Sequence, residues 1–319
     1  MISRILILFY LLICANFFSQ EKDTIIVSKN DKGDFTSIQE AINQSKAFPY
    51  KRLVIFIKNG IYNEKVKINE WNTNLSIIGE EKDKTIITFD DYFDKINKGR
   101  NSTFSTSTLS IEANDTVLKN LTIENVSGDI GQAIALSITA TRVSVINCKI
   151  LGNQDTLYLS GEGKQFLKNC YIEGTTDFIF GNATSYFENC KIHSKKDSYI
   201  TAASTPENAE FGFVFKDCKI TAEKKLSKIY LGRPWRIFAK TAFINCNFEA
   251  NILPEGWHNW DKQVAEKHSY FAEFKNYGKG SSNQKRVKWS YQLSNKEVKK
   301  YNKNNILKDY KKINWYEIF

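Results

Sequence analysis

Two aspartates, Asp155 and Asp177, have the spacing in this sequence that most directly suggests chemistry. Each begins a short apolar run, DTLYL and DFIFG, and they lie 22 residues apart. Asn-Cys pairs at 147–148 and 169–170 have the same separation, so one repeat unit separates the two aspartates. If the units stack as neighbouring strands, the carboxylates lie about 4.8 Å apart. Two carboxylates that close do not both ionise readily, which predicts a protonated general acid beside an ionised nucleophile.

The elements that must position this pair are predicted by a six-residue phrase that recurs along the chain. The phrase is a hydrophobic residue, any residue, Asn or Asp, Cys or Leu, any residue, and Ile or Phe. Its spacing varies from 20 to 28 residues, which indicates constant strands joined by loops of variable length. β-branched and aromatic flanks predict an all-β solenoid, a parallel β-helix. The copies are LKNLTI, VINCKI, LKNCYI, FENCKI, FKDCKI and FINCNF, beginning at Leu118, Val145, Leu167, Phe187, Phe215 and Phe243.

The Asn of each phrase has a local physical role. Asn tolerates the left-handed backbone conformation of a sharp bend between strands, so the residues on either side can point inward. The cysteines that follow are expected to stack as small core residues, with disulfides or a metal site as the alternative. Three histidines and no CxxC pair argue against a zinc site.

A second column follows from the same register. Asp155, Asp177 and Asp197 each lie eight residues after the Asn of their unit, and Gln132 precedes Asp155 by 23 residues. These four residues are therefore expected to line one face. Each alone could be a polar residue at the start of a strand, but stacked like charges are costly and need a reason. For Asp197, a solvated position is favoured over a role in substrate binding.

The N-terminus reads as a leader. Residues 1–20 contain Arg4 and an apolar run too short to be a good membrane-spanning helix, which predicts a secretory signal peptide. A lipoprotein signal with Cys14 as the lipidated residue is the minor alternative. Residues 21–319 then form one domain with five cysteines, an odd number that argues against a full disulfide framework.

The mature chain has a net charge of +9. This charge fits an acidic partner, but the lysines are spread along the whole chain and do not form a patch, so a solvated surface explains them as well. We expect no nucleic-acid partner and no stable membrane insertion.

Helical caps are expected at the two ends. Residues 34–47 predict a short helix with capping-box spacing at Thr36 and Gln39, followed by a buried strand at 53–57. Near the other end, Ser294 and Glu297 have the same spacing.

A Lys-rich helical stretch over Val298–Leu307 follows this second capping signal. Since a β-helix exposes its core and strand edges at both ends, terminal covers are needed. We expect a tail packed along the side of the solenoid.

The turn YLGRPW, residues 230–235, carries two further candidates. Gly232 and Pro234 predict a tight turn from which Arg233 and Trp235 project. Arg can hold a carboxylate ionised through two hydrogen bonds, and Trp can stack on a sugar ring. A structural ion pair and a core Trp explain the two residues equally well.

Taken together, these motifs resemble the pectinesterases (pectin methylesterases, carbohydrate esterase family 8). The resemblance extends from about Thr24 to the C-terminus. It rests on QAIAL, GNQDTLY, TTDFIFG and YLGRPW in this order, with GIYNEKV, YITA, GFVFKDC, PEGWHNW and RVKW.

This resemblance implies a right-handed parallel β-helix that hydrolyses methyl esters of homogalacturonan to polygalacturonate and methanol. It implies that Asp177 is the nucleophile and that Asp155 is the general acid and then the base. Arg233 would keep Asp177 charged, and Gln132 and Gln154 would stabilise the oxyanion.

The same resemblance implies a substrate-binding set and a setting for the enzyme. The substrate-binding residues would be Trp235, Phe178, Thr108 and Tyr158. Pectin would be the partner, with no metal or organic cofactor. From the predicted signal peptide we expect a secreted protein, extracellular or periplasmic, and we expect it to be a monomer.

The sequence departs from the family after YITA, and rival functions stay open. Relatives commonly carry Gln and a basic residue where this chain has Ala203 and Ser204, which puts the preferred substrate pattern in doubt. A calcium-dependent polysaccharide lyase on the same solenoid could use Asp155, Asp177 and Asp197 as a carboxylate cluster. A carbohydrate-binding protein without activity and an esterase for another polyuronide are further alternatives.

Overall fold

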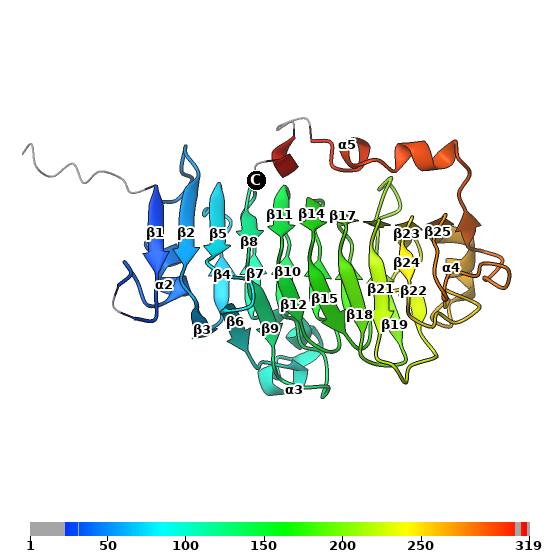
Figure 1. Ribbon diagram of the computed structural model, residues 1–319, viewed down its shortest axis with the longest axis horizontal. Helices are drawn as coiled ribbons and strands as arrows, with labels where there is room; N and C mark the ends of the chain where they lie inside the picture. The colour runs from blue at the N-terminus through cyan, green and yellow to red at the C-terminus, as the bar shows by residue number, and fades with distance from the viewer. Residues whose placement is uncertain (1–22, 31, 310–313, 318–319) are drawn as a thin grey trace, which may run out of the picture.

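The protein is described by a computed structural model that covers residues 23–30, 32–309 and 314–317. Strands dominate it, and they form three parallel sheets that wind round one axis as a right-handed parallel β-helix, as expected (Figure 1). The predicted leader at residues 1–20 lies outside the described residues. Among the described residues, no helix has the length and apolar character needed to cross a membrane.

Sheet A has eleven strands and runs the full length of the solenoid. Its strands are β1 (Thr24–Val27), β2 (Leu53–Ile57), β5 (Leu75–Gly79), β8 (Val117–Lys119), β11 (Val143–Ile146), β14 (Lys164–Lys168), β17 (Thr184–Glu188), β20 (Phe213–Lys216), β23 (Lys240–Ile244), β25 (Tyr270–Phe274) and β26 (Tyr291–Gln292). The predicted strand at 53–57 is β2.

Sheets B and C complete each turn of the solenoid, with eight and seven strands. Sheet B contains β3 (Gly60–Asn63), β6 (Thr85–Phe89), β9 (Thr122–Asn125), β12 (Lys149–Leu151), β15 (Tyr171–Gly174), β18 (Lys191–Ser194), β21 (Lys219–Ala222) and β24 (Asn247–Phe248). Sheet C contains β4 (Val66–Ile68), β7 (Leu109–Ile111), β10 (Leu136–Ile138), β13 (Leu157–Leu159), β16 (Ile179–Gly181), β19 (Tyr199–Ala203) and β22 (Tyr230–Pro234).

The bend between sheets A and B is made by the repeated Asn or Asp, as predicted. Left-handed φ angles are the conformation that Asn and Asp tolerate best among residues with a side chain. Neighbouring bends also bond to each other, since Asn147 Nδ2 donates to Asn120 Oδ1 at 2.8 Å and Asn189 Nδ2 to Asn169 Oδ1 at 2.7 Å. The bend residues, with φ from 51° to 56°, are Asn120, Asn147, Asn169, Asn189, Asp217 and Asn245.

Behind the bends the core is built from ladders of identical residues. Phe215 of β20 stacks between Phe187 and Phe243, with ring centroids 4.3 Å and 4.5 Å away. The thiols form a second ladder, and burial raises the pKa of the Cys148 thiol to about 12. All five described cysteines are buried free thiols, which confirms their predicted role as core residues: Cys148, Cys170, Cys190, Cys218 and Cys246.

Helix α2 (Ile38–Asn43) packs against the first strands. Its cap is one residue later than predicted: Ser37, not Thr36, is the N-cap, and its Oγ accepts from Glu40 N at 3.2 Å. Glu64 explains the shift, because its carboxylate accepts the N–H groups of Ile38 and Gln39 at 3.0 Å each. A carboxylate from the next turn therefore satisfies the free N–H groups of this helix.

The C-terminal tail runs back along sheet A, as expected (Figure 1). The capping box is confirmed: Ser294 N donates to Glu297 Oε2 at 2.8 Å, and Glu297 N donates to Ser294 Oγ at 3.2 Å. The predicted helix over 298–307 is instead two short pieces, η2 (Glu297–Lys300) and α5 (Lys303–Ile306), followed by η3 (Trp315–Glu317). The break comes at Asn302, whose side chain accepts from Asn305 N and starts a new helix.

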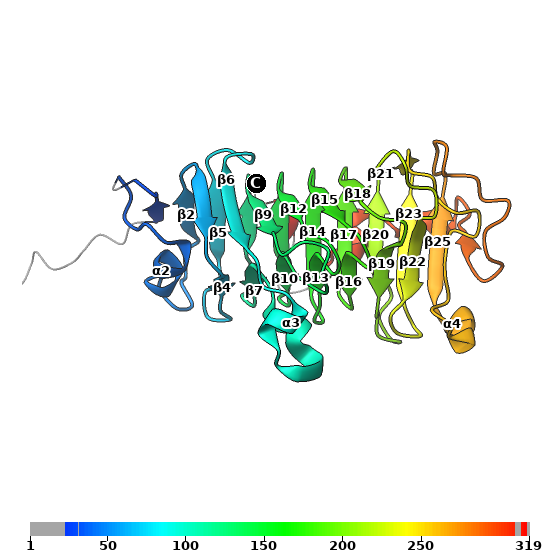
Figure 2. The same cartoon turned by 90° about the horizontal axis from the view of Figure 1, so that it is seen from below.

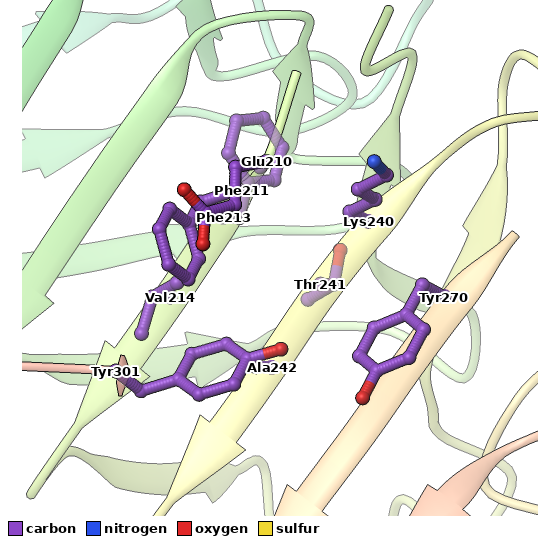
Figure 3. Close-up of a pocket in the computed structure, with 10 residues that line it drawn as sticks. Glu210, Phe211, Phe213, Val214, Lys240, Thr241, Ala242, Tyr270 and Tyr301 are labelled. Carbon is purple, nitrogen blue, oxygen red and sulfur yellow. The ribbon is translucent and has the colours of Figure 1, made fainter. Parts of the chain in front are cut away.

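A small hollow lies between the tail and sheet A (Figure 3). Its walls include Phe211, Val214, Tyr270 and Tyr301, and the buried Thr241 Oγ1 has no hydrogen-bond partner among the described residues. This hollow is on sheet A, whereas the aspartates singled out above precede strands of sheet C. It therefore belongs to the docking of the tail.

Two helical segments that the sequence did not predict stand on the side of sheet C. Helix α3 (Phe93–Ile96) and the 3-10 helix η1 (Gly99–Ser105) link β6 to β7, and α4 (Gln263–His268) precedes β25. Figure 2 shows α3 below β10 and α4 below β25, so that β16 lies between them along the axis.

The phenylalanine ladder gives a test of the core. Phe215→Ala removes a fully buried ring that stacks on both neighbours, so it should lower the free energy of unfolding by about 3–5 kcal/mol. Denaturant titration followed by tryptophan fluorescence measures this loss. Ile61→Ala, at a position that is 63% exposed, is the control. A loss at Phe215 no larger than the control's would contradict the stacked core.

Candidate active site

The register of sheet C places the two aspartates at equivalent positions one strand apart, as their spacing predicted. Strand β13 pairs with β16 with Leu157 beside Ile179, so Asp155 lies beside Asp177. Each aspartate has a left-handed φ, 62° and 50°, in the turn before its strand. In both turns the N–H group of the aspartate donates to a carbonyl oxygen of the following turn: Asp155 N to Thr176 O, and Asp177 N to Tyr199 O.

Arg233 distinguishes the two carboxylates. Its Nε donates to Asp177 Oδ1 at 3.0 Å and its Nη2 to Asp177 Oδ2 at 2.7 Å, so the guanidinium holds both oxygens of Asp177. Gly232 lets β22 pack closely against β19, because a Cβ at this position would lie 2.0 Å from Thr201 Oγ1. The side chains of Asp177 and Arg233 are 8% and 18% exposed, so water screens this ion pair weakly.

The guanidinium is itself held between two rings. Its Cζ lies 3.9 Å from the centroid of Tyr199 and 3.6 Å from that of Trp260, distances at which an arginine is attracted to a ring. His258 fixes the loop that carries Trp260, since its Nδ1 accepts from Trp260 N at 2.9 Å. Lys262 Nζ donates to the carbonyl oxygens of Pro234 and Trp235.

Burial and neighbouring charges give the carboxyl groups of Asp155 and Asp177 different pKa values. Burial raises the pKa of Asp155 well above its ordinary value, and the negative charge of Asp177 raises it further. Burial also raises the pKa of Asp177, but hydrogen bonds from Arg233 oppose this. The carboxyl that keeps its proton is therefore Asp155, and the carboxylate that ionises first is Asp177.

The two glutamines lie beside the pair on adjoining turns. Ala133 N donates to Gln154 O at 3.1 Å, which places the segment of Gln132 next to that of Gln154. Both side chains are partly exposed, and neither amide has a hydrogen-bond partner among the described residues. Their N–H groups are therefore available to a ligand.

The Gln132 segment is fixed by backbone bonds. Phe93 N donates to Gln132 O at 2.9 Å, and the buried Asn125 Nδ2 donates to the carbonyl oxygens of Asp91 and Ile134. The unpredicted α3 segment thus helps to position a candidate oxyanion donor.

The predicted column is correct for the aspartate pair but wrong for its two ends. From the pairing of Leu136 with Leu157, Ile134 aligns with Asp155, and Gln132 lies two residues earlier. Asp197 is likewise out of line, because Tyr199 occupies the position beside Asp177. Its exposed carboxylate accepts the N–H groups of Ser227 and Lys228, so the structure holds no row of three stacked aspartates here.

An aromatic row continues outward from the carboxylates across sheet C. Tyr158 of β13 lies between Phe104 and Phe180, with centroid distances of 5.1 Å and 4.8 Å. Phe180 in turn lies 5.9 Å from Trp235. Tyr158 and Trp235 are partly exposed, and Phe104 is 42% exposed. These rings form an apolar surface beside the aspartate pair.

Two predicted substrate-binding residues lie elsewhere. Phe178 is 0% exposed and belongs to the core of the solenoid, because the turn at Asp177 directs it inward. Thr108 is also 0% exposed, and its Oγ1 donates to Glu124 O at 2.9 Å. Neither side chain can reach a ligand on the outer face, so both predictions are corrected.

Sequence reasoning missed four side chains of the site, and for one the signal was present. Phe180 follows Asp177 by three residues, as Tyr158 follows Asp155, so the repeat offset would have identified it. Tyr199 and Trp260 lie within motifs that the sequence singled out, YITA and PEGWHNW, without a role for either ring. For Phe104, on the unpredicted η1, the sequence offered no signal.

Comparisons with known proteins show the family and agree with this fold. A family model for pectinesterases matches residues 24–310. Pectinesterase 31 of Arabidopsis thaliana is 38% identical over 280 residues, covering 85% of this chain and 88% of the relative. Putative pectinesterase 11 of Arabidopsis thaliana is 37% identical over 284 residues, covering 86% and 76%.

Solved structures of pectin methylesterases have the same fold as this chain. A pectin methylesterase from carrot superposes with a TM-score of 0.84 at 29% identity, covering 89% of this chain and 92% of the other. A pectin methylesterase in complex with hexasaccharide VII has a TM-score of 0.79 at 28% identity, covering 90% and 97%. The chain belongs to the pectinesterase family of carboxylic ester hydrolases.

Proposed function

We propose that this protein hydrolyses the methyl esters of homogalacturonan, with Asp177 as nucleophile and Asp155 as general acid and base. One observation carries this proposal: of two neighbouring carboxyl groups, Arg233 holds only that of Asp177. A nucleophile must be ionised and a general acid protonated, and this arrangement favours each state at the residue that needs it.

The chemistry is a double displacement. An oxygen of Asp177 attacks the ester carbonyl, and the tetrahedral intermediate collapses as Asp155 protonates the departing methoxide to give methanol. This leaves a mixed anhydride between Asp177 and the uronate. Asp155, now ionised, takes a proton from water as the water attacks the anhydride. Collapse of the second intermediate frees Asp177 and the uronic acid, and the net reaction consumes one water per ester.

Gln132 and Gln154 supply the oxyanion donors in this proposal. Their amides have no hydrogen-bond partner among the described residues; Gln154 directly precedes Asp155, and Gln132 lies one turn further from Asp177. N–H donors aimed at a developing negative charge stabilise the transition state. The fixed backbone of the Gln132 segment supports this role, because a donor held in place before reaction needs no reorganisation during it.

The aromatic row supports a sugar polymer as substrate. Tyr158 and Trp235 offer partly exposed rings beside the carboxylates, and Phe104 and Phe180 extend the same surface. A solved relative binds a hexasaccharide. The net charge of +9 of residues 21–319 suits a partly de-esterified, anionic chain.

We further infer that the enzyme works as a secreted monomer. The apolar start of residues 1–20 supports export, and pectin is an external polymer. Mass spectrometry of the exported protein would locate the cleavage site, and light scattering would give the oligomeric state. An uncleaved intracellular product would contradict export.

Asp177→Asn tests the reaction. Methanol release from highly methylated homogalacturonan, with a chelator present, should fall by on the order of 10⁴-fold or more, because an amide cannot form the anhydride. The chelator separates this reaction from a calcium-dependent lyase, whose unsaturated product would absorb ultraviolet light.

The matched control is Asp197→Asn, which changes an exposed aspartate outside the pair. It should keep nearly full activity. A folded wild-type protein that releases no methanol would contradict the proposed substrate, and a screen of other esterified uronans would follow. Retained activity in Asp177→Asn would contradict the nucleophile.

The dependence of kcat/KM on pH should be bell-shaped. Activity falls on the acid side as Asp177 takes up a proton, and on the alkaline side as Asp155 loses the proton it must give to methoxide. Initial rates from about pH 3 to about pH 8, corrected for hydrolysis without enzyme, measure this profile. A rate that stays constant toward high pH would contradict the role of Asp155 as acid.

Asp155→Asn should lower the activity and raise the free energy of unfolding. Native Asp155 keeps its proton to a higher pH than the unfolded chain does, so the free energy of unfolding of the wild type falls as pH rises between these two pKa values. Asn stays neutral, so the stability gained by the variant should grow as pH rises above about 4 and then level off. Thermal unfolding over this range measures it, with Asp94→Asn on α3 as control. A gain that does not change with pH would contradict the raised pKa.

A further inference from the structure

We propose that Lys262 is a positioning residue for the carboxylate pair: it fixes the turn that carries Arg233 and Trp235, and it places a second positive charge beside Asp177. This inference rests on the proposed esterase reaction for its kinetic test. Its physical basis is independent of the substrate.

The first step is the location of Lys262. The segment that carries it forms the next turn of the solenoid after β22, because Gly232 bridges Trp257 and His258 N donates to Gly232 O at 3.1 Å. Trp257 is 1% exposed and stacks on Phe271 with centroids 4.5 Å apart. Lys262 therefore projects from an anchored segment.

The second step is what the ammonium group contacts. Lys262 Nζ donates to Pro234 O at 3.2 Å and to Trp235 O at 3.0 Å, and these two carbonyls directly follow Arg233. It also lies 4.6 Å from the ring centroid of Trp260, the same ring that packs on the Arg233 guanidinium. The Lys262 side chain thus contacts both the backbone next to Arg233 and the Trp260 ring that packs on the Arg233 guanidinium.

The third step is electrostatic. The charge of Lys262 favours the ionised form of Asp177, in addition to the larger effect of Arg233. The other titratable or charged groups around Asp177 are Asp155 on the preceding turn and Tyr199 on β19. On the Lys262 segment they are His258 and the exposed Asp261, and after β22 there is Arg236. Lys262 and Arg233 are the cations whose charges act on Asp177 among the described residues.

This arrangement gives Lys262 an effect that a structural lysine would lack. Without it, Asp177 should take up a proton at a higher pH, and Arg233 and Trp235 should be less well placed. A small displacement of catalytic groups can cost up to about 100-fold in rate.

The test compares Lys262→Met, which keeps the length of the side chain, with Lys262→Arg, which keeps the charge. Lys267→Met, at an exposed position on α4, is the matched control. We expect Lys262→Met to lower kcat more than it raises KM and to move the acid side of the kcat/KM profile to higher pH. Lys262→Arg should largely restore the profile, and Lys267→Met should match the wild type.

Two kinetic outcomes would overturn the inference. The first is a wild-type profile in Lys262→Met. The second is a loss of the same factor at every pH that Lys262→Arg does not rescue, which would show a purely structural lysine.

A second readout does not depend on activity. Carbon NMR can follow the titration of the Asp177 carboxyl, assigned by its disappearance in Asp177→Asn. In Lys262→Met this titration should move to higher pH, and an unmoved titration would overturn the inference. If the wild type released no methanol, the proposed substrate would fail, whereas the titration would still decide the role of Lys262.

Discussion

The parallel register of sheet C is the constraint on which the site depends. Because β13 and β16 pair with Leu157 beside Ile179, the left-handed turns before them place Asp155 and Asp177 one strand apart, about 4.8 Å. Such closeness alone would raise the cost of ionising either group equally. The asymmetry comes from β22, where Gly232 allows close approach and Arg233 binds only Asp177. A symmetric repeat thus becomes an acid and a nucleophile through one side chain that is not part of the repeat.

Repetition also explains how much of this arrangement the sequence could predict. Counting residues is enough to predict stacked strands and neighbouring carboxylates, because these features relate neighbouring repeat units. They are the Asn bends, the cysteine ladder and the 22-residue step between Asp155 and Asp177. Arg233 lies 56 residues from Asp177. Its contact was implied by family resemblance, because no spacing rule connects two turns separated by loops of different length. The handedness of the solenoid came from the same source.

The errors arose where a turn changes the direction of side chains. An eight-residue offset from each Asn bend was correct for Asp155 and Asp177, but a longer loop before β19 put Tyr199 where Asp197 was expected. The family resemblance implies that Phe178 binds substrate, but the left-handed turn at Asp177 directs it into the core. The α3 and η1 segment lies outside the repeat pattern. Its Phe104 ring lies 5.1 Å from that of Tyr158, and Asn125 Nδ2 bonds to the backbone on both sides of the segment, at Asp91 O and Thr106 O.

The same constraint explains why the loops of this fold can vary while the chemistry stays fixed. Strand pairing through sheets A, B and C fixes the height of every turn, so loops that lengthen one repeat to 28 residues do not shift the carboxylates relative to each other. What such loops can change is the surface around the pair: η1 brings an aromatic ring to one side, and the segment before α4 brings Trp260 and Lys262 to the other. The solenoid sets which carboxyl groups meet, Arg233 on β22 sets which of them ionises first, and the loops set what can bind beside them.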